Sequence, residues 1–434
     1  MESILARALK VAEAAEVYLV SSEETSVQFE ANRIKHLETG QTTGVALRII
    51  KDGRLGYATA TRLDAAEALV ANAVETAQFG TRARFQLPGR VDYPGVEVMD
   101  ADVNAVSIET MAGIGEELVA AITGHTPGIL CEGEVSRGVI SVKIINSRGG
   151  QASYKKTIFG LGVEGNIIDG TDMLFVGDSQ SSCHPITTSR NVADSVIRQL
   201  ELAGNKAGVA GKSMPVVFTP YGVAGAFMPP LMAGFNGKTV LEGASPVGGK
   251  MGQHVFDARL CLRDDPTVAW QPGSRPFDDE GVPSQSTPLI EGGVVAGFLY
   301  DLQTAALAGA RSTGNGNRGR GGQPSPSPSA FVIEPGDTAF HDMIKDMKEG
   351  LVVEQLIGAG QGNVLGGDFS GNVLLGYKVE NGELVGRVKD TVVAGNVYDV
   401  IRQITAIGSD ARWVGGFLYS PSLYCPGISV ASKG

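Results

Sequence analysis

Residues 275–319 read RPFDDEGVPSQSTPLIEGGVVAGFLYDLQTAALAGARSTGNGNRG, and this stretch decides the fold of the second half of the chain. It opens with an acidic turn at 278–281, followed by a short apolar run and a Glu291-Gly292-Gly293 turn. A second apolar run follows, and Gly-containing turns between two such runs are typical of a β-hairpin. A small-residue, Ala-rich segment then ends at Gly309, and a basic, Gly-rich loop begins at Arg311.

This order of acidic turn, hairpin, Ala-rich segment and S-T-G-N loop at 312–315 resembles the TldD/PmbA family. Its members are called modulators of DNA gyrase and are grouped with metallopeptidases, and the PmbA branch, also called TldE, is the closer likeness. Three later features match the family's order: E-P-G-D at 334–337 before a helix, G-D-F-S-G at 367–371, and a V-E-N-G-E turn at 379–383. The resemblance covers the whole second half and fits the first half only in outline.

Length and composition predict more than one domain. A chain of 434 residues is too long for a single small core, and its 59 glycines and 19% charged residues indicate a strand- and turn-rich molecule. We expect an α+β fold with N-terminal helix and antiparallel-sheet layers and a larger β-rich C-terminal domain. A Pro- and Gly-containing connector and a small-residue linker predict domains at 1–95, 96–208 and 212–434.

Charge and targeting signals restrict the class of protein. With a net charge of -11 and no Lys/Arg run longer than two residues, direct nucleic-acid binding is not expected. The first twenty residues contain no uninterrupted apolar segment, so neither a signal peptide nor a membrane span is expected, and the predicted location is cytoplasmic. Four cysteines without C-x-x-C spacing favour reduced thiols.

Local periodicity predicts several elements of the first half. Apolar Val45, Leu47 and Ile49 alternate with polar residues that include Arg48, which predicts an antiparallel strand with one wet face. The Asp52-Gly53 pair predicts a hairpin turn after it. Helical spacing predicts helices over residues 3–15, 64–78, 189–203 and 397–406.

Residues 221–236 occupy the segment where TldD-type members of the family carry an H-E-x-x-x-H helix. Two His on one helix face bind zinc, and the Glu beside them activates the bound water. In this chain residues 225–234 read GAFMPPLMAG, without His, Glu or Cys, and Pro229 and Pro230 predict that a helix breaks or begins there. No metal ligand is therefore expected in this segment, and no catalytic residue, metal or cofactor is expected in the chain.

The histidines and cysteines suggest no other metal site by their spacing. Cys183 and His184 are adjacent, but consecutive residues of an extended chain point to opposite faces. Cys425 lacks the C-G-K context of the family's late cysteine, so no ligand role is transferred to it. A zinc site assembled from distant residues is the alternative.

Two further motifs are incomplete. Residues 177–181, GDSQS, begin like a nucleophile elbow but end in Ser where Gly is required, which favours a polar turn. Gly211-Lys212-Ser213 matches the end of a phosphate-binding P-loop, but Lys206 stands where the first Gly is needed, which favours a linker.

The acidic turn and the basic loop supply the candidate contact residues. Clustered acids in a Gly- and Pro-flanked turn are typical of a solvated surface, with binding of a hard cation as the alternative. Residues 314–322 resemble an anion-cradling loop whose amides and arginines hold a carboxylate or phosphate, or else a flexible loop before a Pro-rich segment. The candidate peptide- or partner-contact residues are Asp278, Asp279, Glu280, Arg311, Arg318 and Arg320.

The resemblance implies a zinc-less PmbA/TldE-type subunit of a TldD/TldE metallopeptidase complex that acts on unfolded peptides or peptide precursors. Its expected partner is a TldD-type zinc subunit in a heterodimer, or a second copy in a homodimer. The alternative is a self-sufficient homodimeric peptidase, or a peptide-binding protein, whose site lies elsewhere.

Overall fold

The first half of the chain forms a long, curved sheet of six antiparallel strands. In the computed structural model, which describes residues 1–319 and 322–432, the strand order is β3-β2-β1-β4-β5-β6. The strands are β1 (Ala14–Glu30), β2 (Arg33–Lys51), β3 (Arg54–Ala60), β4 (Leu130–Asn146), β5 (Gln151–Asp169) and β6 (Asp172–Ser182). Because β1 pairs with β4, the strands of the two N-terminal units expected from the sequence belong to one sheet.

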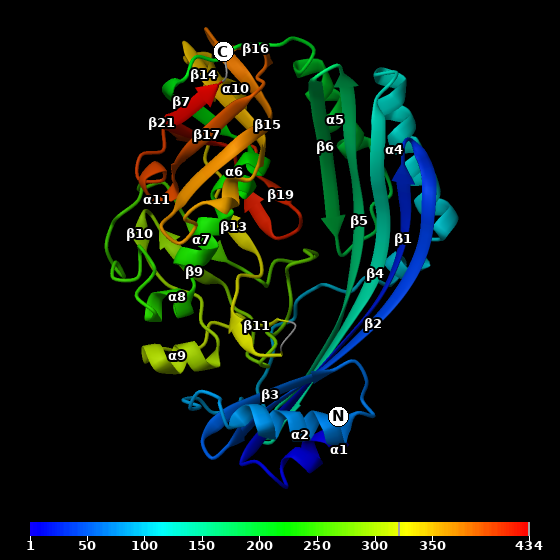
Figure 1. Cartoon of the computed structure of the whole chain (residues 1–434), viewed down its shortest axis with the longest axis vertical. Coiled ribbons are helices and arrows are strands. Elements are labelled where there is room, and N and C mark those ends of the chain that lie inside the picture. Colours follow the sequence, from blue (N-terminus) through cyan, green and yellow to red (C-terminus); the bar gives the residue numbers. More distant parts are fainter. Residues whose placement is uncertain (320–321, 433–434) are drawn as a thin grey trace.

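Helices cover the two ends of this sheet (Figure 1). The lower end of the view carries α1 (Glu2–Ala8) and α2 (Ala66–Ala77), and the upper end carries α4 (Ile108–His125) and α5 (Arg190–Leu202), with α3 (Ala101–Ala105) in the connector. The predicted helices over 64–78 and 189–203 are confirmed. The helix predicted over 3–15 is wrong beyond Ala8, because residues from Ala14 onward pair with β2.

The hairpin between β2 and β3 follows the prediction from Asp52-Gly53. Both residues have positive φ, 51° and 69°, which is the backbone conformation that a tight two-residue hairpin turn needs. The turn fixes the register in which Lys51 lies opposite Arg54.

The C-terminal region contains a sheet of order β14-β7-β21-β17-β15-β16 that closes on itself, because β14 also pairs with β15. Its strands are β7 (Lys212–Phe218), β14 (Glu349–Ile357), β15 (Asp368–Glu380), β16 (Glu383–Arg387), β17 (Thr391–Asn396), β21 (Leu423–Ser432) and, beside β21, β18 (Ala406–Ile407). The helix predicted over 397–406 is only α11 (Val397–Val400), because the chain then turns into β18.

A second C-terminal sheet has the order β10-β9-β8-β13-β20-β19, and β11 and β12 form a separate pair. These strands are β8 (Leu262–Asp264), β9 (Thr287–Glu291), β10 (Val294–Val295), β11 (Gly316–Arg318), β12 (Pro324–Pro326), β13 (Phe331–Ile333), β19 (Arg412–Val414) and β20 (Leu418–Ser420). The helices between them are α6 (Pro220–Ala226), α7 (Met228–Gly234), α8 (Gly237–Leu241), α9 (Leu302–Ala308), α10 (Phe340–Lys345) and the short 3₁₀ helix η1 (Ala359–Gln361). The α+β prediction with a larger β-rich C-terminal part is confirmed.

An aromatic contact docks the C-terminal region on the N-terminal sheet. Phe277 is buried against that sheet, with its ring centroid 4.9 Å from Tyr93 and 5.0 Å from Tyr154. It belongs to a small buried cluster with Tyr18 and Ile144. Phe277 directly precedes the acidic turn, so this contact places the turn on the sheet. Within the described ranges, no helix is long and apolar enough to cross a membrane.

Candidate functional site

The acidic turn lies inside the protein. The side chains of Asp278 and Glu280 are fully buried, and Asp279 is 8% exposed. The expectation that this turn is solvated is wrong, because Phe277 anchors it against the N-terminal sheet while β11 covers it from the C-terminal side.

A chain of ion pairs connects this turn to β1 and β2. Arg48 of β2 binds Glu280 through Nη1, and its Nη2 lies 2.8 Å from Glu16 Oε1. Arg318 of β11 binds the same Glu16 oxygen. Arg48 is only 1% exposed, so the wet face predicted for its strand is wrong at this position, because the C-terminal region covers that face of the sheet. Removing one member of such a buried pair leaves its partner's charge uncompensated.

The Gly-rich loop does hold carboxylates, and they belong to this chain's own acidic turn. The Gly316 amide donates to Asp278 Oδ2 at 2.8 Å, and the Arg318 amide donates to Asp279 Oδ2 at 2.8 Å. A Cβ atom on Gly316 would lie 2.6 Å from Glu280 Oε2, so the close approach of loop and turn requires glycine. These two amides each bind a separate carboxylate of the turn, so this part of the loop binds anions through its backbone.

The three candidate arginines have different surroundings. Arg318 is buried in the ion-pair chain, where its side chain is 3% exposed. Arg311 is exposed, and it makes no ion pair within the part of the chain that is described. Arg320 lies outside the described residues. A contact of these residues or of the acidic turn with a peptide or a partner stays a prediction.

The buried cluster around the turn contains more acids than bases. Burial raises the pKa of Asp278 to about 8, the charge of Glu280 adds to this shift, and Arg275 opposes it. Burial is also the main cause that raises the pKa values of Glu16, Asp264 and Asp301. The buried bases of this cluster are Arg48, Arg275 and Arg318, and its acids are Glu16, Asp264, Asp278, Asp279, Glu280 and Asp301.

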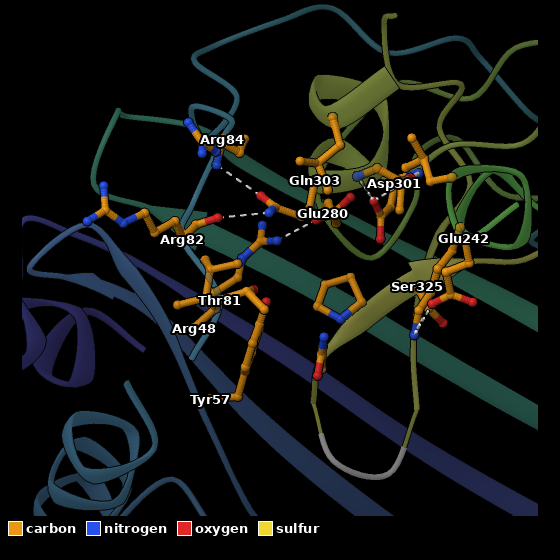
Figure 2. A pocket seen from close by; sticks show the side chains of 17 residues that line it. Arg48, Tyr57, Thr81, Arg82, Arg84, Glu242, Glu280, Asp301, Gln303 and Ser325 are labelled. Atoms are coloured by element: carbon orange, nitrogen blue, oxygen red, sulfur yellow. Dashed lines mark hydrogen bonds and ion pairs between the residues drawn. The ribbon is translucent and has the colours of Figure 1, made fainter. Parts of the chain in front are cut away.

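A cavity of about 760 Å³ opens beside this cluster, between the N-terminal sheet and the C-terminal region. Arg48 and Glu280 form its inner wall, with Tyr57 of β3 on one side and Asp301 at the start of α9 on the other (Figure 2). Sequence reasoning missed Arg48, Tyr57 and Asp301, because nothing local to β2, β3 or α9 shows that these elements meet.

A second, larger cleft lies where α6 faces the strands β4 to β6. Its volume is about 940 Å³, and α6 contributes Tyr221 and Gly225 to its wall. The helical segment breaks between α6 and α7 at Phe227, as the two prolines predicted.

Asp178 ties the two sides of this cleft together. It accepts hydrogen bonds from both terminal nitrogens of Arg412, at 2.9 and 2.8 Å, and from the Tyr221 hydroxyl at 2.6 Å. The polar turn predicted over 177–181 is wrong, since these residues lie within β6. The sequence signal for Asp178 was the incomplete G-x-S-x-G match, which pointed to a turn instead of a strand.

The donor set of this cleft does not fit the zinc that the family name implies. The segment from α6 to α7 supplies no imidazole, thiolate or carboxylate, and the acids lining the cleft come from the sheet: Glu132, Glu134, Glu164 and Asp178. Among residues 1–319 and 322–432, no group of three or more His, Cys, Asp or Glu side chains is arranged to hold a metal ion.

Comparisons with known proteins agree with the order of elements. The family model described as PmbA/TldA metallopeptidase C-terminal domain matches residues 211–432, and the model described as PmbA/TldA metallopeptidase domain 1 matches residues 15–77. An uncharacterized protein of Methanocaldococcus jannaschii is 26% identical over 422 residues, which cover 95% of each chain. The metalloprotease PmbA homolog of Haemophilus influenzae is 24% identical over 423 residues, which cover 93% of this chain and 89% of the relative.

A solved structure shows the same fold over the full length. The crystal structure of TldE from Thermococcus kodakarensis superposes with a TM-score of 0.91 at 23% identity and covers 100% of both chains. Since the C-terminal family model alone spans more than half of the 434 residues, the chain belongs to the PmbA/TldD family.

Proposed function

We propose that this chain is the PmbA/TldE-type subunit, without zinc of its own, of a TldD/TldE metallopeptidase complex that acts on unfolded peptides or peptide precursors. The observation that carries the proposal is the donor-free segment of α6 and α7 beside the 940 Å³ cleft. The metalloprotease names of the relatives and the fold of TldE support a role in proteolysis. The zinc and its water then belong to a TldD-type partner, with a second copy of this chain as the alternative partner.

In this proposal the cleft binds the peptide, and its volume lies in the range of ligand sites. On one side of the cleft the charge of Asp178 is paired with Arg412, and Tyr221 donates to the same carboxylate. The opposite side carries Glu132, Glu134 and Glu164, which make no ion pair with a described residue.

The edge of β6 restricts how a peptide lies in the cleft. The Gln199 side chain bonds both the N–H and the C=O of Gly177, and the Tyr221 hydroxyl accepts from the Ser179 amide. These backbone groups are the ones that an added strand would need. We therefore expect the peptide to lie across the face of the sheet instead of extending it at this edge.

Filling the cleft tests this role. A Cβ on Gly225 meets only Leu356 at 3.5 Å, so Gly225→Leu keeps the fold and places a side chain in the cleft. Gly113→Leu is the matched control, because Gly113 lies on α4 with no described atom within 4 Å of its Cβ position. The measurement is fluorescence anisotropy of a labelled, unstructured 15-residue peptide titrated with each purified chain.

We expect Gly225→Leu to weaken peptide binding by about tenfold or more, since it removes a contact surface and adds a steric clash, whereas Gly113→Leu binds like the wild type. Equal binding by wild type and Gly225→Leu would remove the cleft from the proposal.

A further inference from the structure

The 760 Å³ cavity in Figure 2 has walls from both halves of the molecule. β2, β3 and the segment after α2 form one side, and α8, α9 and β12 form the other. Its size and its position between two packed units are typical of a small-molecule site. It shares no lining residue with the peptide cleft described above.

Two polar side chains point into this cavity with hydrogen-bonding capacity unused (Figure 2). Asp301 is 3% exposed; its Oδ1 accepts from the Thr304 amide at 2.7 Å, and its Oδ2 has no hydrogen-bond donor in the described chain. The Tyr57 hydroxyl also lacks a hydrogen bond to any described residue, since only the backbone of Tyr57 bonds to Thr76. A hydrogen bond to a charged group contributes about 1.5–3 kcal/mol, so a ligand that donates to Asp301 Oδ2 is stabilised in this cavity.

Asp301 is the acid of the cavity wall that has no ion pair within the described chain, because Glu280 pairs with Arg48 and Glu242 pairs with Lys238. The Arg48 guanidinium is shared between Glu16 and Glu280, and it leaves Asp301 without a cation. Arg82 and Arg84 line the rim, but Figure 2 shows their guanidinium ends turned away from Glu280 and Asp301. Burial and the charge of Glu280 raise the pKa of Asp301, and the hydrogen bonds from Thr304 and the charge of Arg48 oppose this shift.

The cation that fits this site is organic. The described side chains nowhere gather three acidic, His or Cys groups around one point, as a metal would need. Leu55, Leu241, Leu307 and the Tyr57 ring give the cavity an apolar part of its wall. Aromatic rings bind ammonium groups on their faces, and leucines bind an apolar body.

We propose that this cavity binds an amine: an ammonium group that is held by Asp301 and the Tyr57 hydroxyl and that carries an apolar body packed on Leu241 and Leu307. The ammonium belongs either to a free amine or to the N-terminus of a peptide. Both sources share this chemistry, and the proposal does not depend on peptide binding at the larger cleft.

The test is calorimetric titration of the full chain with phenethylamine, with its neutral analogue 2-phenylethanol as the first control. Phe-Gly-Gly with a free or an acetylated N-terminus then distinguishes the two sources. If Phe-Gly-Gly with a free N-terminus binds more tightly than phenethylamine, the site is assigned to peptide N-termini. If phenethylamine binds and Phe-Gly-Gly with a free N-terminus does not, the site is assigned to free amines. Both results support the ammonium site.

Three variants locate the site. Asp301→Asn keeps the cap of α9, because Asn is an equally good N-cap, but it removes the charge, and we expect about tenfold or more weaker phenethylamine binding. Tyr57→Phe removes only the hydroxyl group and is expected to weaken binding about fivefold. Asp399→Asn, at an exposed acid of α11, is the matched control and should leave binding unchanged.

Equal binding of phenethylamine and 2-phenylethanol, or no binding of phenethylamine, overturns the proposal. Wild-type affinity in both Asp301→Asn and Tyr57→Phe also overturns it. If Asp301→Asn does not fold, Leu307→Trp is tested in its place. Leu307 is an exposed residue at the rim of the cavity, so the larger tryptophan side chain should fill the cavity and abolish phenethylamine binding. Gly225→Leu must leave phenethylamine binding intact, which separates this site from the peptide cleft.

Discussion

Arg48 joins the two halves of the molecule through a guanidinium that lies between Glu16 and Glu280. Arg48→Met keeps most of the side-chain length but leaves Glu280 buried without its cation and Glu16 with Arg318 as its remaining cation. We expect the free energy of unfolding in urea to fall by about 3–5 kcal/mol.

The control for this variant is Arg62→Met. Arg62 pairs with Asp64 at the surface, where its side chain is 75% exposed, so its loss should leave the free energy of unfolding nearly unchanged. If Arg48→Met and Arg62→Met change the free energy of unfolding equally, the buried ion pairs do not stabilise the fold as described.

Lys156 of β5 gives a pH dependence at a second junction between the halves. Its Nζ donates to the Pro272 carbonyl at 2.5 Å, and burial lowers the pKa of Lys156 to about 8. The unfolded chain has an ordinary lysine pKa of about 10.4, so between these two values it binds more protons than the folded chain. Stability linked to Lys156 therefore rises with pH from about 8 and is lost as pH falls through this value, with a slope of at most about 1.4 kcal/mol per pH unit.

The measurement is urea unfolding of wild type and Lys156→Met at several values between pH 7 and 9.5. We expect the difference in unfolding free energy, wild type minus variant, to increase with pH over this interval. The control is Lys155→Met, at the exposed neighbouring residue. For this variant we expect the difference in unfolding free energy from wild type to stay constant over the same pH interval. A constant difference for Lys156→Met as well would contradict the buried position of its amine.

Single residues show where sequence reasoning stops. The alternation around Arg48 correctly predicted a strand, but not that its polar face is covered, because the cover comes from residues more than 200 positions later. The Gly-rich loop was interpreted either as anion-cradling or as flexible, and the structure shows that the amides of Gly316 and Arg318 bind carboxylates of this chain's own acidic turn.

At the scale of elements, the contact between β11 and the acidic turn depends on one missing side chain. Gly316→Ala would place a methyl group 2.6 Å from Glu280 Oε2, which already accepts from the Leu302 amide at 2.7 Å. Glu280 is fully buried and cannot move away easily. We expect a loss of about 1–3 kcal/mol in unfolding free energy.

Gly319→Ala, just after β11, is the matched control, because no described atom lies within 4 Å of its Cβ position. It should leave stability unchanged or slightly raise it, since alanine restricts the unfolded chain more than glycine does. If Gly316→Ala is tolerated as well as Gly319→Ala, the turn and the loop are less tightly packed than described.

Elements with strong local signals were predictable, and those decided by distant pairing were not. The Asp52-Gly53 hairpin and the helix α2 follow from turn chemistry and helical spacing. The helical spacing over residues 3–15 continues past Ala8, but strand pairing of β1 with β2 and β4 on both sides takes precedence over it. Tertiary pairing overrides local propensity in this way in many proteins.

At the scale of the whole molecule, the order of motifs in the second half was enough to identify the family, because that order can be read directly from the sequence. The meeting of the two halves was not predictable, since no local pattern tells which face of the long sheet the C-terminal region covers. Both the 760 Å³ cavity and the 940 Å³ cleft lie at this junction, so neither was visible in the sequence.

The central claim is that this chain supplies a wall of the site and a TldD-type partner supplies the zinc. The most direct test incubates an unfolded, fluorescently quenched peptide with this chain alone, with a TldD-type chain alone, and with both. We expect no cleavage by this chain alone and cleavage by the mixture, which is lost when the partner's Glu between the two His is changed to Gln, because the zinc-bound water then lacks its base. Chelator-sensitive cleavage by this chain alone, together with one equivalent of zinc retained through dialysis, would contradict the account.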